Sequence, residues 1–232
     1  MENNYNICKE KRDYIEDLKE YYLEYHFDEE LRKAEQRILA LNDPELSYLF
    51  AINFKDALVN NHADVVIASN DEDRIYDFIC DVKNYDNNHF EEKIIELGNL
   101  QVLLSFARYM QDEIDLTRIS NIMIASGDAK YNYLFAKDVK GVDIKAHGQV
   151  VINSKDPKFC YTFARDIDVE NYLMYEKVVM ESKDPKWCYY FMKDIPTINK
   201  EKLKNIIINS DNLEYISLIQ EENNNTLVLK KN

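Results

Sequence analysis

The chain has few of the residues that interrupt helices. Its 232 residues include only four glycines and four prolines, whereas a fold rich in turns and strands usually needs more of both. It has no run of about 18 apolar residues, which a membrane-spanning helix requires. The N-terminal segment is charged and lacks the apolar stretch of a secretory signal. These absences predict a helical protein with no membrane contact.

Residues that usually mark catalytic or metal sites are also sparse. Cys8, Cys80, Cys160 and Cys188 form no CxxC pattern and no Cys/His metal spacing. The sequence contains no HExxH, no GxSxG and no glycine-rich phosphate loop. We therefore expect no catalytic residue, no metal and no cofactor, and we expect reduced cysteines in the cytoplasm.

The dominant feature of the sequence is a repeat of 28 residues. It is clearest in three successive segments, SGDAKYNYLFAKDV from Ser126, SKDPKFCYTFARDI from Ser154 and SKDPKWCYYFMKDI from Ser182. The same pattern begins at positions 41, 69, 97 and 210, with one extra residue between positions 97 and 126. A period of this length is typical of stacked helical repeats. The predicted divisions are a helical cap at 1–40, seven repeats at 41–222 and a tail at 223–232.

Two columns of the repeat predict its first helix. The tenth position is Phe in six units and Ile in the seventh, and the seventh, eleventh and fourteenth positions are mostly apolar or small, which gives one apolar helix face. The third position is Asp or Asn in every unit, as expected for a residue that caps a helix N-terminus. These predicted caps are Asp43, Asp71, Asn99, Asp128, Asp156, Asp184 and Asn212.

A second helix is predicted in the other half of each unit. In five units Asp or Asn recurs fifteen or sixteen residues after the first cap, at Asp86, Asp115, Asp143, Asn171 and Asn199. This helix ends in three adjacent apolar residues, as in the sequence VVI at 150–152. Three adjacent apolar residues cover more than one face of a helix, so we expect the second helices to form the more buried layer. The predicted fold class is all-α: a right-handed α-α solenoid of about seven two-helix repeats.

The unit resembles, in a shorter form, the HEAT, armadillo and TPR classes of α-α repeat. The phrase S-K-D-P-K-x-C-Y-x-F-A-R-D also resembles uncharacterised short helical repeats of low-GC bacteria and their phages. The richness in Asn, Lys, Ile and Tyr indicates the same kind of genome. The resemblance covers residues 41–222, implies protein binding and assigns no functional residue. We expect the protein in a bacterial cytoplasm, or in the cytoplasm of the host if a phage encodes it.

Charge divides the predicted array in two. Residues 41–125 contain 16 acidic and 6 basic residues, whereas residues 126–209 contain 12 acidic and 14 basic residues. The acidic side chains expected to meet a partner are Glu45, Asp71, Glu72, Asp73 and Asp77. In the basic half, the fifth and twelfth positions are predicted on one solvent face of the first helix, where stacking would align them in a basic ridge. The ridge residues are Lys130, Lys137, Lys158, Arg165, Lys186 and Lys193.

Other columns have a packing interpretation. The eighth position is Tyr in five units, and we expect these rings at the rim of the core. The thirteenth position is Asp in four units, near a helix C-terminus where the helix dipole disfavours an acid. We expect a hydrogen bond to a neighbouring unit or an ion pair to compensate. Cys160 and Cys188 are expected in the core, and Trp187 is either a core residue or an exposed anchor for a partner.

These features predict a non-enzymatic protein-binding solenoid. The first hypothesis is an acidic inhibitor, of the immunity or anti-CRISPR type, that blocks the basic site of a nucleic-acid-binding effector or nuclease. The basic ridge is a second candidate surface, for an acidic partner or for the backbone of RNA or DNA. The alternatives are a generic scaffold or adaptor and a nucleic-acid enzyme similar to the HEAT-like DNA glycosylases, which would need a basic concave groove.

Overall fold

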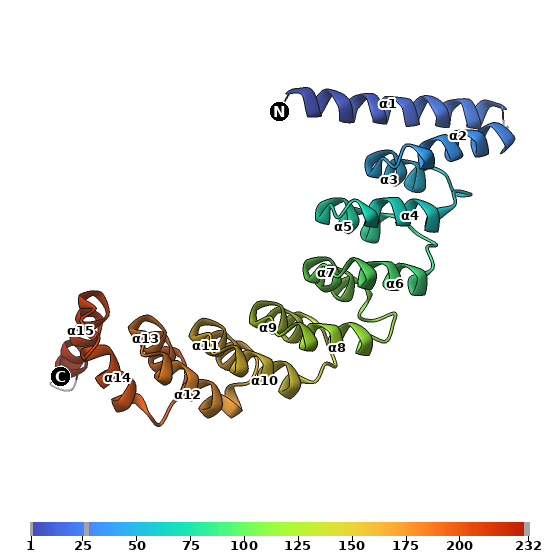
Figure 1. Ribbon diagram of the computed structural model, residues 1–232. Helices are drawn as coiled ribbons and strands as arrows, with labels where there is room; N and C mark the ends of the chain where they lie inside the picture. Colours follow the sequence, from blue (N-terminus) through green and yellow to red (C-terminus); the bar gives the residue numbers. More distant parts are fainter. Residues whose placement is uncertain (1, 26–27, 230–232) are drawn as a thin grey trace. The chain divides into compact units, whose positions relative to one another are not determined.

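The computed structural model describes residues 2–25 and 28–229, and it is helical throughout (Figure 1). This described part holds fifteen α-helices and one short 3₁₀ helix, and it contains no strand. The chain divides into two compact units, Met1–Asp115 and Leu116–Asn232. None of the described helices combines the length and the apolar character needed to cross a lipid bilayer. The all-α prediction is therefore confirmed.

The N-terminal unit is built from two layers of helices. Figure 1 shows α3, α5 and α7 in one layer and α4 and α6 in the other. The predicted cap is a pair of helices, of which α1 packs against α3, and α2 packs against α3 and α4. The bounds are α1 Glu2–Tyr25, α2 Asp28–Ala40, α3 Pro44–Asn53, α4 Val59–Ala68, α5 Glu72–Asp81, α6 Asn87–Leu97 and α7 Leu100–Met110.

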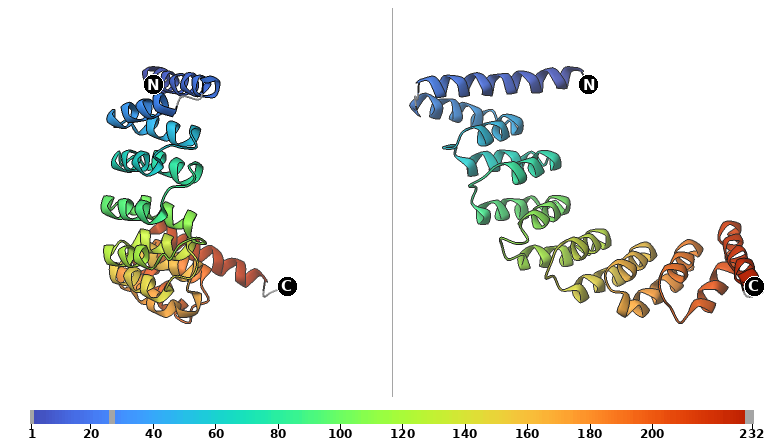
Figure 2. Two further views of the ribbon diagram at one scale, coloured as in Figure 1. Left: turned by 90° about the vertical axis from the view of Figure 1, so that its right-hand side faces the viewer. Right: turned by 180° about the vertical axis from the view of Figure 1, so that it is seen from behind.

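The C-terminal unit repeats the same two-layer arrangement. The first helices α9, α11 and α13 pack against one another in sequence order, and the second helices α8, α10 and α12 do the same. Both layers are visible from behind in the right-hand view of Figure 2. The bounds are α8 Thr117–Ser126, α9 Ala129–Asp138, α10 Ile144–Ser154, α11 Pro157–Asp166, the 3₁₀ helix Val169–Asn171, α12 Tyr172–Ser182, α13 Pro185–Asp194, α14 Lys200–Ile208 and α15 Leu213–Leu229. The helix α15 thus extends beyond the predicted start of the tail at 223.

The predicted first-helix caps are all observed. Each Asp or Asn side chain of the third column accepts a hydrogen bond from a backbone N–H in the first turn of the helix that follows. In Asp156, for example, Oδ1 lies 2.8 Å from the N atom of Lys158. Pro44, Pro157 and Pro185 occupy the first helical position, where a missing N–H leaves no hydrogen bond unmade.

A short hydrogen-bonded turn leads from each second helix into the next first helix. In five of these turns a Ser hydroxyl donates to the carbonyl three residues earlier at 2.6–2.7 Å. The same oxygen accepts the N–H of the cap residue at 3.1–3.3 Å. The residue just before the cap is left-handed in all seven turns, with φ between 50° and 69°, which ends the preceding helix. These left-handed residues are Asn42, Asn70, Gly98, Gly127, Lys155, Lys183 and Asp211.

The core follows the tenth column of the repeat. Its six phenylalanine rings are all fully buried, and they are Phe50, Phe78, Phe106, Phe135, Phe163 and Phe191. The expectation that the second helices are more buried is wrong: α9 buries five residues and α10 three, and α13 buries three and α14 two. Successive residues of a helix point about 100° apart, so only the middle residue of each apolar triplet, such as Val151, is fully buried in most units.

The second-helix caps are only partly as predicted. Asp86 and Asp143 accept backbone hydrogen bonds as caps, whereas the residue at the N-cap position of α8 is Leu116 rather than Asp115. Asn171 and Asn199 precede α12 and α14 without capping them. The amide of Asn199 instead donates at 2.6 Å to Glu176, which is fully buried and belongs to the preceding 28-residue segment. Sequence spacing does not distinguish this use of Asn from capping.

The two lysines in left-handed turns give a stability prediction. We expect Lys183→Gly to raise the free energy of unfolding by about 0.5–1 kcal/mol, because glycine adopts positive φ without the clash of a Cβ atom, although it loses more entropy on folding. Urea unfolding followed by circular dichroism measures this. The control Lys186→Gly places glycine in the first turn of α13 and should lower stability. Destabilisation by both variants would contradict the prediction.

Candidate interaction surfaces

Tyrosine–aspartate hydrogen bonds connect successive first helices. Each bond joins the eighth position of one predicted unit to the thirteenth position of the next, 33 residues later. The tyrosine hydroxyl donates to a carboxylate oxygen in Tyr48 with Asp81 (2.7 Å), Tyr133 with Asp166 (2.5 Å) and Tyr161 with Asp194. The compensation expected for the thirteenth-column acids is confirmed in these three cases. The constant spacing also shows that the bridged first helices stack in register within each unit.

Two cations of the predicted basic ridge belong to these bridges. Lys137 Nζ lies 3.0 Å from the Tyr133 hydroxyl and 3.5 Å from Asp166 Oδ2. Arg165 donates from Nη1 to the Tyr161 hydroxyl at 2.9 Å and from Nε to Asp166 Oδ1 at 2.6 Å. Lys137 thus reaches from α9 to α11, whereas both partners of Arg165 lie on its own helix, and Lys193 Nζ lies 5.5 Å from the centre of the Tyr189 ring. Asp166 pairs with both Lys137 and Arg165, so one carboxylate offsets part of two positive charges.

Contacts at the bridges lower the pKa of Asp166 and raise the pKa of Tyr161. The hydrogen bond from Arg165, with further help from Tyr133, lowers the pKa of Asp166 to about 2. Burial and the neighbouring Asp194 raise the pKa of Tyr161 to about 12. At neutral pH Asp166 is thus an ionised acceptor and Tyr161 a protonated donor, which is the combination a bridge requires.

The fifth-position lysines of the ridge have a different environment. Lys130, Lys158 and Lys186 are exposed, and each Nζ lies 4.8–5.2 Å from the centre of the ring that follows it in the sequence. Those rings are half-buried, and they belong to Tyr131, Phe159 and Trp187. The predicted ridge is therefore two rows, a twelfth-position row in which Lys137 and Arg165 contact the bridges, and an exposed row at the fifth position. Trp187 is packed against the core on one side and next to this exposed row on the other.

The acidic residues singled out from the sequence fall into three roles. Glu45 is buried and forms an ion pair with Arg74, which also contacts Asp77 at 3.1 Å. Asp71 caps α5. Only Glu72 and Asp73 are exposed and outside both the ion pair and the cap. Glu45 is thus a structural residue, a role that its position in an acidic stretch does not reveal.

The two compact units differ strongly in net charge. Met1–Asp115 contains 27 acidic and 12 basic residues, a net charge of −15, whereas Leu116–Asn232 contains 16 acidic and 17 basic residues, a net charge of +1. At least 15 carboxylates of the N-terminal unit therefore have no basic residue of that unit to balance them. A surface of this kind creates a negative potential that extends over about one Debye length, roughly 8–10 Å in physiological salt.

Two histidines and two cysteines are buried, whereas Cys80 and His89 are only partly buried, and His89 Nε2 lies 2.8 Å from Asp64 Oδ1. His62 and His147 are fully buried, and burial lowers the pKa of each, so both are neutral at pH 7. His147 Nδ1 lies 2.8 Å from Asn132 Oδ1. Burial also raises the pKa of both Cys160 and Cys188 to about 12, which suppresses the reactive thiolate. These side chains pack the core, as expected for the two cysteines.

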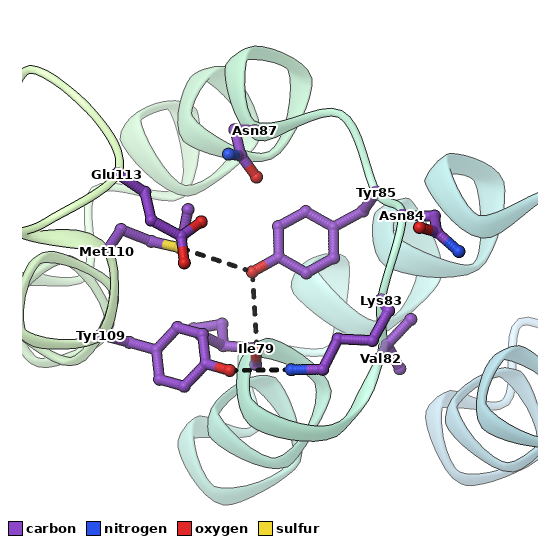
Figure 3. A pocket seen from close by; sticks show the side chains of 9 residues that line it. All are labelled: Ile79, Val82, Lys83, Asn84, Tyr85, Asn87, Tyr109, Met110 and Glu113. Atoms are coloured by element: carbon purple, nitrogen blue, oxygen red, sulfur yellow. Dashed lines mark hydrogen bonds between the residues drawn. The ribbon is translucent and has the colours of Figure 1, made fainter.

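The pocket drawn in Figure 3 lies between the loop that follows α5 and the end of α7. The rings of Tyr85 and Tyr109 enter it from opposite sides. Lys83 donates to the Tyr109 hydroxyl at 3.0 Å, and the Tyr85 hydroxyl lies 3.5 Å from the carbonyl of Ile79. Its volume of about 110 Å³ is below the roughly 300 Å³ at which small-molecule sites begin, whereas a second pocket, lined by Lys145, Asp168 and Met174 among others, has a volume of about 320 Å³.

Neither a metal site nor similarity to a known protein assigns a function to the charged surfaces. Within residues 9–24 and 28–221, whose side chains the structure describes, no three His, Cys, Asp or Glu side chains are grouped so that they could hold a metal ion. No protein-family model, curated protein or solved structure matches the chain. The functional argument therefore depends on charge, exposure and hydrogen bonding in this molecule alone.

The low pKa of Asp166 gives a prediction about acid stability. A carboxyl group whose folded pKa lies below its unfolded value stabilises the fold above the unfolded value, and this contribution is lost as the pH falls toward the folded pKa. We expect Asp166→Asn to lower the free energy of unfolding by about 1 kcal/mol at pH 7 and to have much less effect near pH 2. Urea unfolding between pH 7 and pH 2 measures the difference. Glu170→Gln, an exposed acid in the same unit, should leave the pH profile unchanged.

The buried amide of Asn132 gives a second prediction. Its Nδ2 donates to the carbonyls of Met123 at 2.7 Å and Asp128 at 2.8 Å, and its Oδ1 contacts His147. Asn132→Ala leaves buried polar groups without partners, so we expect a loss of about 2 kcal/mol. Asn153→Ala changes the same residue type at an exposed site in α10 and should cost less than about 0.5 kcal/mol. Thermal unfolding that gave both variants the same midpoint would disprove this role for Asn132.

Proposed function

We propose that this chain is a non-enzymatic binding protein whose acidic N-terminal unit blocks the basic, nucleic-acid-binding site of a partner protein. In this proposal the chain is a right-handed array of seven two-helix repeats that acts in the cytoplasm as an inhibitor, of the immunity or anti-CRISPR type. The observation that supports it is the net charge of −15 on one compact unit. A site that binds the phosphates of a nucleic acid is positively charged, so an acidic surface complements it.

The arrangement of the acids favours binding over catalysis. The buried or bridged carboxylates, such as Glu45, Glu176 and Asp166, serve the fold. The exposed ones, such as Glu72 and Asp73, are held on short rigid helices rather than on loops. A rigid, acidic surface raises the rate of association with a basic partner and selects against acidic ones.

A helical-repeat enzyme acting on DNA is disfavoured by the same observations. Such an enzyme needs a basic surface around an accessible general base or nucleophile. The charge of the N-terminal unit is of the opposite sign. His62, His147, Cys160 and Cys188 are buried, and the partly exposed His89 lies beside Asp64 in that acidic unit. A scaffold with several partners has no specific observation in its favour.

Charge reversal tests the proposal. The double variant Glu72→Lys and Asp73→Lys leaves the Asp71 cap and the Arg74 ion pairs in place and removes one exposed hydrogen bond, from the Asn99 amide to Glu72. We expect it to bind the partner at least about tenfold more weakly, a loss of about 1.4 kcal/mol. Partners are captured from host cells on the tagged full-length chain after nuclease treatment, and affinity is measured with the purified partner. The wild-type chain should also displace nucleic acid from that partner.

The matched control makes the same change of charge on the other unit. Glu170→Lys with Glu201→Lys reverses two exposed acids of the C-terminal unit and should leave the affinity unchanged. Circular dichroism verifies that both double variants are folded. Equal losses in both variants, or a captured partner whose nucleic-acid binding is unaffected by the wild-type chain, would refute the proposal.

A further inference from the structure

Five lysines gather at the turns that begin the first helices of the C-terminal unit. They lie at the left-handed turn position or two residues after the cap, and all are exposed. These turn lysines are Lys130, Lys155, Lys158, Lys183 and Lys186. In the part of the chain that the structure describes, none of the five forms an ion pair with a carboxylate, and the fifth-position three contact only aromatic rings.

The carboxylates beside these lysines are committed to the backbone. Asp128, Asp156 and Asp184 cap α9, α11 and α13, with the acceptor oxygen 2.8–3.0 Å from a backbone nitrogen in each case. Their negative charge is set against the positive end of a helix dipole. The turn lysines therefore present positive charge that this edge of the unit does not itself neutralise.

Two of the turn lysines occupy positions that the fold does not favour. Lys155 and Lys183 have φ values of 57° and 55°, where a residue with a Cβ atom is strained by about 1–2 kcal/mol. Four other turns have Asn or Gly at this position, the residue types that tolerate it best. A strained residue that the fold does not require points to a function for its side chain. The function available to an exposed lysine is contact with an anion.

The turn lysines form a row because the first helices stack in register. The helices α9, α11 and α13 pack side by side, and the bridges from Tyr133 to Asp166 and from Tyr161 to Asp194 keep the same spacing. Neighbouring packed helices lie about 8–10 Å apart, and a stacked nucleic-acid strand advances about 3.4 Å per phosphate. Each repeat therefore spans roughly two or three nucleotides, and it offers one lysine in the first turn and two lysines in each of the other two turns.

Aromatic side chains accompany the row and distinguish its ligand. The rings of Phe159 and Trp187 lie next to the turn lysines. Each ring also contacts a tyrosine of the preceding first helix. The ring centres are 6.2 Å apart for Tyr133 and Phe159, and 5.8 Å apart for Tyr161 and Trp187. Lysines that alternate with half-exposed rings match a strand whose phosphates alternate with bases. An acidic protein surface offers no such alternation.

We infer that the five turn lysines form a binding edge for the phosphate backbone of a single-stranded nucleic acid. The half-exposed rings of Tyr131, Phe159 and Trp187 supply stacking surfaces once the lysine above each ring moves onto a phosphate. This activity belongs to the C-terminal unit and is independent of the blocking function proposed for the acidic unit. The bridged cations Lys137 and Arg165 contribute little, because their charge is shared with Asp166.

The only tryptophan of the chain, Trp187, reports binding directly. The full-length chain is titrated with oligo(dT) of about 20 nucleotides at several salt concentrations, starting near 50 mM. We expect quenching of Trp187 emission and a slope of log K against log salt of about −3 to −4, since each phosphate contact on a single strand contributes about −0.7. The double variant Lys155→Gly and Lys183→Gly should reduce the slope by about 1.4 and the affinity at low salt about tenfold or more. Because glycine relieves strain in both turns, reduced binding by this variant does not arise from unfolding.

A matched control removes the same kind of charge elsewhere in the unit. Lys145→Gln with Lys177→Gln alters exposed residues of α10 and α12 and should leave the slope unchanged. Absence of quenching and binding at low salt, or equal effects of the two double variants, would overturn the inference. Equal binding of a duplex would overturn the single-strand assignment. Equal binding of poly-glutamate, or salt-dependent self-association abolished by the glycine variant, would identify an acidic protein surface as the ligand instead.

Discussion

The structure depends on the burial of one phenylalanine ring in each of six first helices, α3, α5, α7, α9, α11 and α13. These helices are 10 or 11 residues long, and helices shorter than about 12–15 residues are marginal in water. Each first helix is therefore stable only when its neighbours enclose its phenylalanine, as around Phe135 and Phe163. Caps, turns and tyrosine–aspartate bridges position the helices for that contact. They contribute individually less than the burial they make possible, since a buried Phe is worth about 1.5–3 kcal/mol.

The parts of this fold that sequence predicts are those governed by local chemistry. An aspartate such as Asp156 caps its own helix, and a phenylalanine such as Phe163 recurs at the helical period, so both can be read from the chain alone. The tyrosine–aspartate bridges could not be predicted in this way, because that requires knowing which residues 33 positions apart face each other on neighbouring first helices. The sequence could supply a list of possible partners for Asp166 but not the choice among them.

The errors in prediction have physical causes of the same kind. Asn199 has the residue type of a cap, but a buried carboxylate on the neighbouring unit competes for its amide. Glu45 belongs to an acidic stretch, but one arginine within reach converts it into a buried ion-pair partner. The left-handed geometry at Lys155 and Lys183 could have been inferred from Asn and Gly in the same column. A column that contains Asn, Gly and Lys indicates a position where the backbone must be left-handed. Lysine adopts this conformation there with more strain than Gly or Asn.

The turn between a second helix and the next first helix affects how the length of such a chain can change during evolution. Its serine hydroxyl, left-handed residue and cap satisfy the ends of both helices with groups from within about six residues. A segment of 28 residues inserted or deleted between two such turns leaves every helix end with its own partners and brings matching faces together. Gene duplication and loss can therefore lengthen or shorten the array by whole repeats, while the side chains on its surface diverge from one copy to the next.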